Sequence, residues 1–270
     1  MKFILTITLA LTIHTVMGQE SQISFGWGLG NFKKQDLSFS EMIHRDYSPF
    51  NVMLGYQKSG NIIQSVDARF GMYESMVSES FTYTDNEDRT FHSYPHSFLM
   101  LDINYSLKKE IWSSNSTKVY VGGRVRNRLH IGYYLFADHA GSTNYYFSTG
   151  LDAVVSAQQQ IGDFHKVGLQ VAAPLFSYNA RNPYLTWDDE YFEAVSGHSA
   201  ISSVIGYYQS GSWRSWGSSQ IFDMDLDYTY QLSDRLDLGA KYWLSVNLNQ
   251  IPTYMASINN TLFLVANYKF

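Results

Sequence analysis

Apolar and polar residues alternate along ten stretches of the chain, a pattern typical of β-strands with one apolar and one polar face. The clearest stretch covers 236–248, where leucine, alanine, tyrosine and valine hold the even positions and mainly polar residues hold the odd ones. Stretches 119–133 and 222–230 are nearly as regular. The other predicted strands are 22–30, 50–58, 61–73, 97–107, 145–158, 165–176 and 260–270.

Two architectures fit this pattern: a soluble β-sandwich and a transmembrane β-barrel. Several stretches have ten or more residues, whereas soluble strands usually have about 5–6 and tilted membrane strands need about 9–11. Short and long connections also alternate, which is typical of barrels with short periplasmic turns and long extracellular loops. The predicted short turns lie near 59–60, 108–116, 160–164 and 231–235, and the long loops near 31–48, 74–96 and 177–218.

Aromatic residues gather at the ends of the predicted strands, as in the two aromatic girdles of a membrane barrel. At the turn end these residues are Tyr56, Tyr105, Tyr228, Tyr230, Tyr268 and Phe270. At the loop end they are Tyr133, Tyr134, Phe136, Tyr145, Tyr146 and Phe147. The fold class predicted from these features is all-β, a single antiparallel transmembrane β-barrel.

Ten strands satisfy the alternation of short and long connections. Segment 198–209 mixes serine, glycine, isoleucine and tyrosine without clean alternation, so it is expected to be a hairpin or an extension above the membrane rather than a spanning strand. A barrel of twelve strands is the alternative, and it needs a further strand from 31–48.

The first residues have the features of a secretory signal peptide. Met1-Lys2 gives a positive start, an apolar run follows, and Val16 and Gly18 are small enough for the cleavage positions. The predicted division is therefore a signal peptide over 1–18 and a barrel over 19–270. A mature chain that begins with Gln19 resembles the secreted proteins of the Bacteroidota.

The last strand ends with alternating apolar residues, with Tyr268 two positions before a terminal Phe270. This ending resembles the assembly signal of bacterial outer-membrane β-barrel proteins, although Val265 and Ala266 stand where that signal often has glycine. The resemblance implies a location in the outer membrane of a Gram-negative bacterium. It also implies two partners, outer-membrane lipid and the barrel-assembly machinery.

Composition narrows the choice of function. The chain has 19 Lys and Arg against 24 Asp and Glu, a net charge of -5 with no basic run, which makes nucleic acid a poor partner. The absence of cysteine excludes disulfides, thiolate metal sites and thiol catalysis. No cofactor signature is present, so no cofactor is predicted, and we assign neither catalytic nor metal-ligating residues.

If the apolar face of each strand meets lipid, the other face fills the lumen. Two runs stand out on that face, a basic one on the strand 119–133 and an acidic one on the strand 222–230. We expect these runs to cross the middle of the membrane and either to face each other or to share intermediate partners, because ten strands enclose a narrow interior. The predicted lumen set is Arg69, Arg124, Arg126, Arg128, His130, Asp67, Asp102, Asp152, Asp223, Asp225, Asp227, Asp237 and Lys241.

The charged lumen leaves two functions open. The leading hypothesis is a narrow channel or binding barrel for small polar solutes, which needs a continuous water path past Arg126 and Asp225. The alternative is a closed structural or adhesive barrel that acts through its extracellular loops, in which these charges pair with each other.

A hydrolase at the loop-side rim is a third hypothesis. Asp138-His139 is superficially similar to the Asp–His pair of omptin proteases, and His198-Ser199 to part of the catalytic set of the outer-membrane phospholipase. Neighbouring residues on a strand point to opposite faces, which argues against both pairs. Aromatic residues of the longest loop could stack on sugars or peptides; the loop candidates are Tyr184, Trp187, Trp213 and Trp216.

Overall fold

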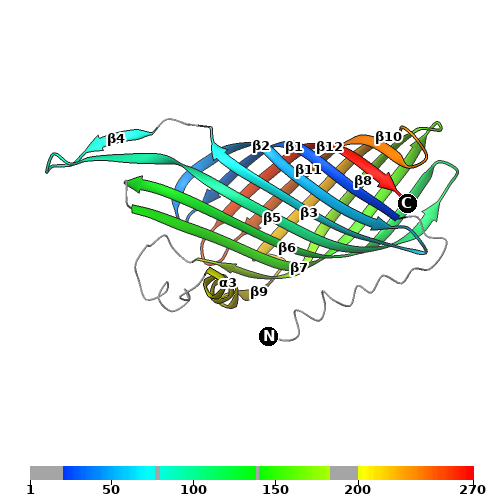
Figure 1. The fold of residues 1–270 in the computed structure, drawn as a ribbon. Helices are drawn as coiled ribbons and strands as arrows, with labels where there is room; N and C mark the ends of the chain where they lie inside the picture. Colours follow the sequence, from blue (N-terminus) through cyan, green and yellow to red (C-terminus); the bar gives the residue numbers. More distant parts are fainter. Residues whose placement is uncertain (1–20, 77–79, 138–139, 183–199) are drawn as a thin grey trace.

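The computed structural model shows a closed antiparallel β-barrel of ten strands (Figure 1). The structure describes residues 21–76, 80–137, 140–182 and 200–270. The predicted signal peptide over 1–18 lies outside the described residues. The barrel strands are β1 (Ser21–Asp36), β2 (Ser40–Lys58), β3 (Ile62–Ser75), β5 (Thr90–Ser113), β6 (Thr117–Ala137), β7 (Ala140–Ile161), β8 (His165–Arg181), β10 (Ser219–Gln231), β11 (Leu236–Asn249) and β12 (Met255–Lys269).

Each strand of the barrel pairs with the next barrel strand along the chain, and the pairing of β1 with β12 closes the ring. β8 pairs with β10 from Ala172↔Asp223 to His165↔Tyr230. β1 pairs with β12 along its length, and Ser21 and Phe270 exchange backbone hydrogen bonds of 3.2 and 2.9 Å at the end of that pair. A closed barrel leaves no long edge strand unpaired, which removes the hazard of edge-to-edge aggregation.

Side chains alternate between the wall's two faces, as the sequence pattern predicts. On β1 the outward Phe25, Trp27 and Leu29 are between 42% and 52% exposed, whereas the inward Phe32 is 1% exposed. The inside is therefore the packed side of the wall, and the outside of β1 carries an exposed apolar surface. The prediction of ten strands whose side chains alternate between an inner and an outer face is confirmed.

The boundaries of the predicted loops are wrong at the loop end. Residues 31–48 are not a long loop, because β1 and β2 continue as a paired ladder up to Asp36 and Ser40. Part of 74–96 also forms structure: β4 (Phe81–Thr84) pairs with the first residues of β5 and makes a hairpin that projects beyond the barrel (Figure 1). The twelve-strand alternative is wrong as well, since 31–48 only extends two strands that were already counted.

Segment 198–209 is neither a hairpin nor an extended strand. Its described part forms the helix α3 (Ala200–Gln209), which leads into the short strand β9 (Ser212–Ser215) beside β8. Alternation is absent there because isoleucine, valine and tyrosine recur at helical spacing. In the described part of the chain no helix has the length and apolar character required to cross a membrane.

Aromatic residues do form two groups on the outer wall, with two corrections. Tyr56, Tyr228 and Tyr268 are exposed near the end with the short turns, and Tyr133 is exposed toward the other end. Tyr134 and Tyr146, expected in the outer girdle, are instead buried in the lumen at 8% and 1% exposure. They alternate with Tyr133 and Tyr145, so only one of each neighbouring pair can face outward.

Candidate functional site

The middle of the lumen is filled by a buried network of ion pairs. Arg124 of β6 donates to Asp152 of β7 from Nη2 at 2.6 Å and from Nε at 2.9 Å. Arg126 shares the same carboxylate through Nε at 3.1 Å and also donates to Ser148 at 3.0 Å. Arg126 and Asp152 are both fully buried. One aspartate therefore holds two arginines of the predicted basic run.

The network also crosses the lumen. Asp223 of β10 accepts from Arg124 at 2.5 Å and from Arg128 at 3.2 Å. Since β7 and β8 separate β6 from β10 in the wall, these pairs span the interior rather than a strand ladder. Arg128 also pairs with Asp102 and donates to Ser245 of β11 at 2.9 Å. The basic and acidic runs thus face each other and pair.

Arg69 extends this network toward β11. Its Nη2 lies 2.8 Å from Asp225 and its Nε lies 3.4 Å from Asp67. The guanidinium group stacks over the ring of Trp243 at 4.7 Å, and Arg128 approaches the same ring at 5.9 Å. Trp243 was not assigned to the site from the sequence, although its odd position in 236–248 places it on the inward face.

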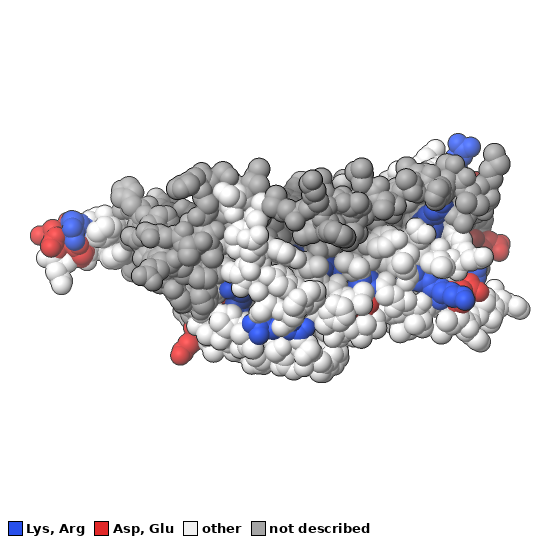
Figure 2. Space-filling view, turned by 90° about the horizontal axis from the view of Figure 1, so that it is seen from below, with Lys and Arg blue, Asp and Glu red and all other residues white. Residues whose placement is uncertain are grey.

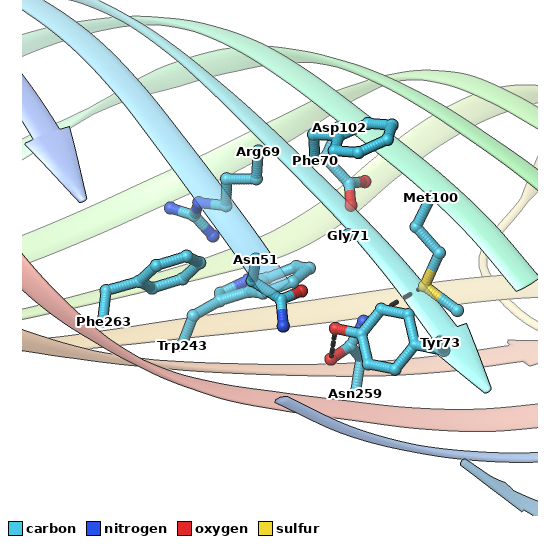
Figure 3. Close-up of a pocket in the computed structure, with 10 residues that line it drawn as sticks. All are labelled: Asn51, Arg69, Phe70, Gly71, Tyr73, Met100, Asp102, Trp243, Asn259 and Phe263. Atoms are coloured by element: carbon cyan, nitrogen blue, oxygen red, sulfur yellow. Dashed lines mark hydrogen bonds between the residues drawn. The ribbon is translucent and has the colours of Figure 1, made fainter. Parts of the chain in front are cut away.

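A small cavity lies beside Arg69 and Trp243 (Figure 3). Tyr73 donates to Asn259 at 3.0 Å, and Asn259 donates to the sulfur of Met100 at 3.2 Å across this space. The cavity offers room for about one water molecule. The cavity interrupts the packing locally, but it is much too small to form a path for a solute.

The lumen charges nearer the short turns are less tightly buried. Asp237 is buried and accepts from Lys269 at 2.7 Å, and Lys108 donates to Gln170 at 2.8 Å. Asp227 and Lys241 are half-buried at this level. His130, at the other side of the network, is buried between Tyr146 and Phe32 with ring centroids at 5.8 and 6.1 Å. Every residue of the predicted lumen set therefore points inward.

Toward the loop end of the network, an apolar layer of side chains lies inside the barrel. Phe32, Tyr73, Phe98, Met100 and Tyr134 pack together and are all buried. Lys34 lies above this layer, 5.3 Å from the ring of Phe98, and donates to Asn144 at 2.9 Å. Aromatic side chains inside the barrel therefore lie between the central charges and the loop end of the barrel.

A second polar cluster lies at the mouth of the barrel, and we call His44, Asp46, His96 and Tyr134 the mouth cluster. Nε2 of His96 is 2.5 Å from Asp46, and the rings of His44 and His96 meet edge to face at 4.6 Å. Buried atoms of the cluster without a hydrogen-bond partner are His44 Nε2, Asp46 Oδ2 and Tyr134 Oη. The sequence places the two histidines and Asp46 at the loop-side rim, but it does not bring them together, because 31–48 and 74–96 were expected to be loops.

Two buried cations, Arg181 and Lys34, also connect elements at the mouth of the barrel. Arg181 of β8 donates to Ser38 at 2.9 Å and to the backbone oxygen of Thr253 at 2.9 Å, so it ties two loop-end turns together. Its Nη2 also lies 3.3 Å from Asp36, which pairs with Lys34 at 3.2 Å. The mouth is therefore held in one arrangement by interactions between β1, β8 and the turn before β12.

The tip of the β4–β5 hairpin carries a separate group of exposed charges, visible at the far end of the projection in Figure 2. Arg89 lies 2.7 Å from Asp85 and 3.2 Å from Glu87. The hydrogen bond from Arg89 lowers the pKa of the Asp85 carboxyl. On one face of the hairpin the aromatic rings of Phe81, Tyr83 and Phe91 stack at centroid distances of 5.4 and 6.5 Å.

The remaining predicted site residues divide into two groups. Trp213 and Trp216 are highly exposed on the outer wall and not in a loop above the mouth. Tyr184, Trp187, His198-Ser199 and Asp138-His139 lie outside the described residues. Among the residues that the structure describes, no group of three or more histidine, aspartate or glutamate side chains is arranged to hold a metal ion.

The geometry defines a ten-stranded β-barrel protein with a charged, internally paired lumen. No protein-family model matches the chain, and a search of curated proteins finds no match. Among solved structures, Neisserial surface protein A aligns at 11% identity and a TM-score of 0.35, covering 94% of this chain and 97% of its own.

Two other solved structures illustrate the range of similar barrels. Ail, the attachment invasion locus protein of Yersinia pestis, aligns at 10% identity and a TM-score of 0.29, covering 94% and 100% of the two chains. The beta domain of the Bordetella autotransporter BrkA aligns at 7% identity and a TM-score of 0.39, covering 93% and 99%. These neighbours are outer-membrane β-barrel proteins, and at such identities none of them lends its own role to this chain.

Proposed function

We propose that the chain is a non-enzymatic barrel of the Gram-negative outer membrane, closed at its centre, which acts through its extracellular end. The observation that carries the proposal is the buried network in which Arg126, Asp152 and Asp223 are joined across the lumen. A path for solutes would need these groups to be hydrated, because an unpaired buried charge is costly. Here each of them has an ionic partner.

The outer wall supports the membrane location. On β8, Val167 is level with the exposed Tyr228 of the lower aromatic group, and Phe176 lies about nine residues further up. At about 3.3 Å per residue and a strand tilt near 40° this separation is about 23 Å, close to the ~25 Å apolar band of outer-membrane barrels. The wall between these levels carries Leu169, Val171 and Leu175, each exposed and apolar.

A narrow channel for small polar solutes, the leading hypothesis from the sequence, stays a prediction with weaker support. The charges expected to line its water path pair with one another, and the apolar layer around Phe98 lies above them. The extracellular end offers more to a partner: the mouth cluster has unpartnered polar atoms, and the hairpin presents an aromatic face. Aromatic faces beside polar groups suit contacts with sugars or peptides.

Single-channel recording tests the closed barrel. We expect the refolded wild-type protein to show no steady conductance in a planar bilayer, because the network fills the lumen. Arg126→Ala removes a buried side chain from its centre and is expected to produce discrete current steps. Circular dichroism of both proteins controls for folding. Steady wild-type conductance that is altered by the Arg126→Ala variant would instead support the channel.

The carboxyl-terminal strand suggests an interaction with the assembly machinery. Tyr268 and Phe270 are exposed and stack at 6.4 Å on the outer wall, beside the seam where β12 meets β1. We expect Phe270→Ala to lower the amount of assembled barrel in cells several-fold, with little effect on refolding of the purified protein. Ile161→Ala, which alters an exposed apolar residue near the same end, is the matched control. Equal loss in both variants would contradict a specific signal.

A further inference from the structure

Helix α3 lies against the outer wall of the barrel instead of over its mouth (Figure 1). Tyr145 of β7 lies between the inward Asn144 and Tyr146 and nonetheless is only 2% exposed. It is covered because Tyr207 of α3 stacks on it, with ring centroids 4.4 Å apart and planes at 17°. Tyr208 meets Phe147 of β7 and Tyr178 of β8 at 6.3 and 5.1 Å. The helix thus covers outward-facing aromatic residues of two strands.

Specific contacts fix the helix in this place. The hydroxyl of Tyr178 lies 3.0 and 3.2 Å from the backbone oxygens of Tyr208 and Gln209, which are among the terminal carbonyls that a helix cannot satisfy internally. The helix is followed by Gly211, where a Cβ atom would lie 2.6 Å from the ring of Tyr178. The chain therefore returns to the wall at close range, and α3 cannot move outward without losing these contacts.

The height of the helix matches the upper edge of the apolar band. Tyr178 lies about two residues above Phe176, which we placed about 23 Å above the lower aromatic level. β9 pairs with β8 at this level, from Asn179↔Ser212 to Phe176↔Ser215. Trp213 packs against Phe176 and Tyr178 and is still 68% exposed, and Trp216 is 57% exposed. Tryptophan and tyrosine are enriched at the level of lipid headgroups.

The free side of the helix has the chemistry of a lipid contact. Ile205 is exposed there, and no residue from Ala200 to Gln209 carries a charge. An uncharged helix avoids the cost of bringing ionised groups to the edge of the hydrocarbon. The other exposed residues described in the helix, Ser202 and Gln209, are polar but uncharged. Below the level of the helix, β8 exposes the apolar side chains of Val171 and Leu175.

We propose that α3, Trp213 and Trp216 form a shelf that rests in the headgroup layer of the outer leaflet and binds its lipid. The occupant is the lipid in which the barrel is embedded, because β9 and α3 contact the upper part of β8 and the same strand exposes the apolar Val171 and Leu175 directly below them. The proposal rests on the membrane location proposed above. It adds a lipid-binding surface, on the side of β7 and β8, to the apolar outer wall of the described strands.

Spin labels at single cysteines test the shelf directly, since the chain has no native cysteine. Three variants are labelled in vesicles of outer-membrane lipid: Ile205→Cys on the helix, Val171→Cys on the apolar wall and Thr84→Cys on the projecting hairpin. Collisions with oxygen report lipid, and collisions with a nickel chelate report water. We expect the oxygen-to-nickel ratio at Ile205→Cys to lie several-fold above that of Thr84→Cys and below that of Val171→Cys.

The outcomes separate the two proposals. A water-exposed Ile205→Cys with a lipid-exposed Val171→Cys overturns the shelf and leaves the membrane barrel intact. A label at 205 that neither reagent reaches is covered by protein, such as a second copy of the chain, and also overturns it. A water-exposed Val171→Cys overturns the membrane location itself. Tyr178→Phe keeps the ring but removes the hydroxyl, and it is expected to increase the mobility of the label at 205.

Discussion

Replacing Asp152 by alanine is expected to lower the free energy of unfolding by about 3–5 kcal/mol, because breaking a buried ion pair leaves an uncompensated charge. Asp152 is the shared acceptor for Arg124 and Arg126, and all three side chains are almost completely buried. Without it Arg126 keeps only the hydrogen bond to Ser148. Urea unfolding of the barrel in lipid vesicles, followed by tryptophan fluorescence, measures the change.

Asp85→Ala provides the matched control for this prediction. Asp85 also pairs with an arginine, at 2.7 Å, but the pair lies on the exposed hairpin. Exposed ion pairs typically contribute about 0–1 kcal/mol. The double variant Asp152→Ala/Arg126→Ala should be more stable than Asp152→Ala alone, because it also removes the buried cation that has lost its ionic partner. If Asp152→Ala costs no more than Asp85→Ala, then water reaches the network and the lumen is not closed.

The alternation of residues was sufficient to predict the barrel wall, and the reason is physical. An inward arginine at position 124, 126 or 128 forces its neighbours outward, and a charge on the lipid face would cost about 2–4 kcal/mol at mid-membrane. The register of these strands is therefore specified at every second residue. Pairing between the basic run and Asp223 also followed from the narrowness of a ten-stranded interior.

The upper third of the molecule could not be predicted in the same way. Beyond the apolar band of the outer wall the alternation fades, although the ladder from Asn31↔Tyr47 to Lys33↔Arg45 continues. The mouth cluster depends on that ladder, because His44 and Asp46 meet His96 only when both strands extend. Helix α3 was missed for a related reason: its tyrosines Tyr207 and Tyr208 pack against residues of β7 and β8 that are distant in sequence.

At a few inward positions, glycine lets neighbouring strands approach closely, and Gly122 is the most constrained of these. A Cβ atom there would lie 1.9 Å from the backbone oxygen of Leu107 on the neighbouring strand. Gly122→Ala therefore requires β5 and β6 to separate, and overpacking of this kind typically costs about 1–3 kcal/mol. We expect the variant to lose stability in the same unfolding assay and to assemble less efficiently in cells.

The adjacent Gly123 is the control for this effect. A Cβ atom there meets nothing closer than the backbone oxygen of Asp152 at 3.8 Å, so Gly123→Ala should change stability by less than about 0.5 kcal/mol. Gly239 repeats the constraint between β10 and β11, with a Cβ only 2.1 Å from the oxygen of Tyr228. A loss of stability in Gly122→Ala and Gly239→Ala, but not in Gly123→Ala, would show that the close approach of neighbouring strands requires glycine. The strand propensity of glycine would not explain such a difference. Equal losses at all three positions would contradict this explanation, because the lower backbone entropy of unfolded alanine would by itself stabilise each variant.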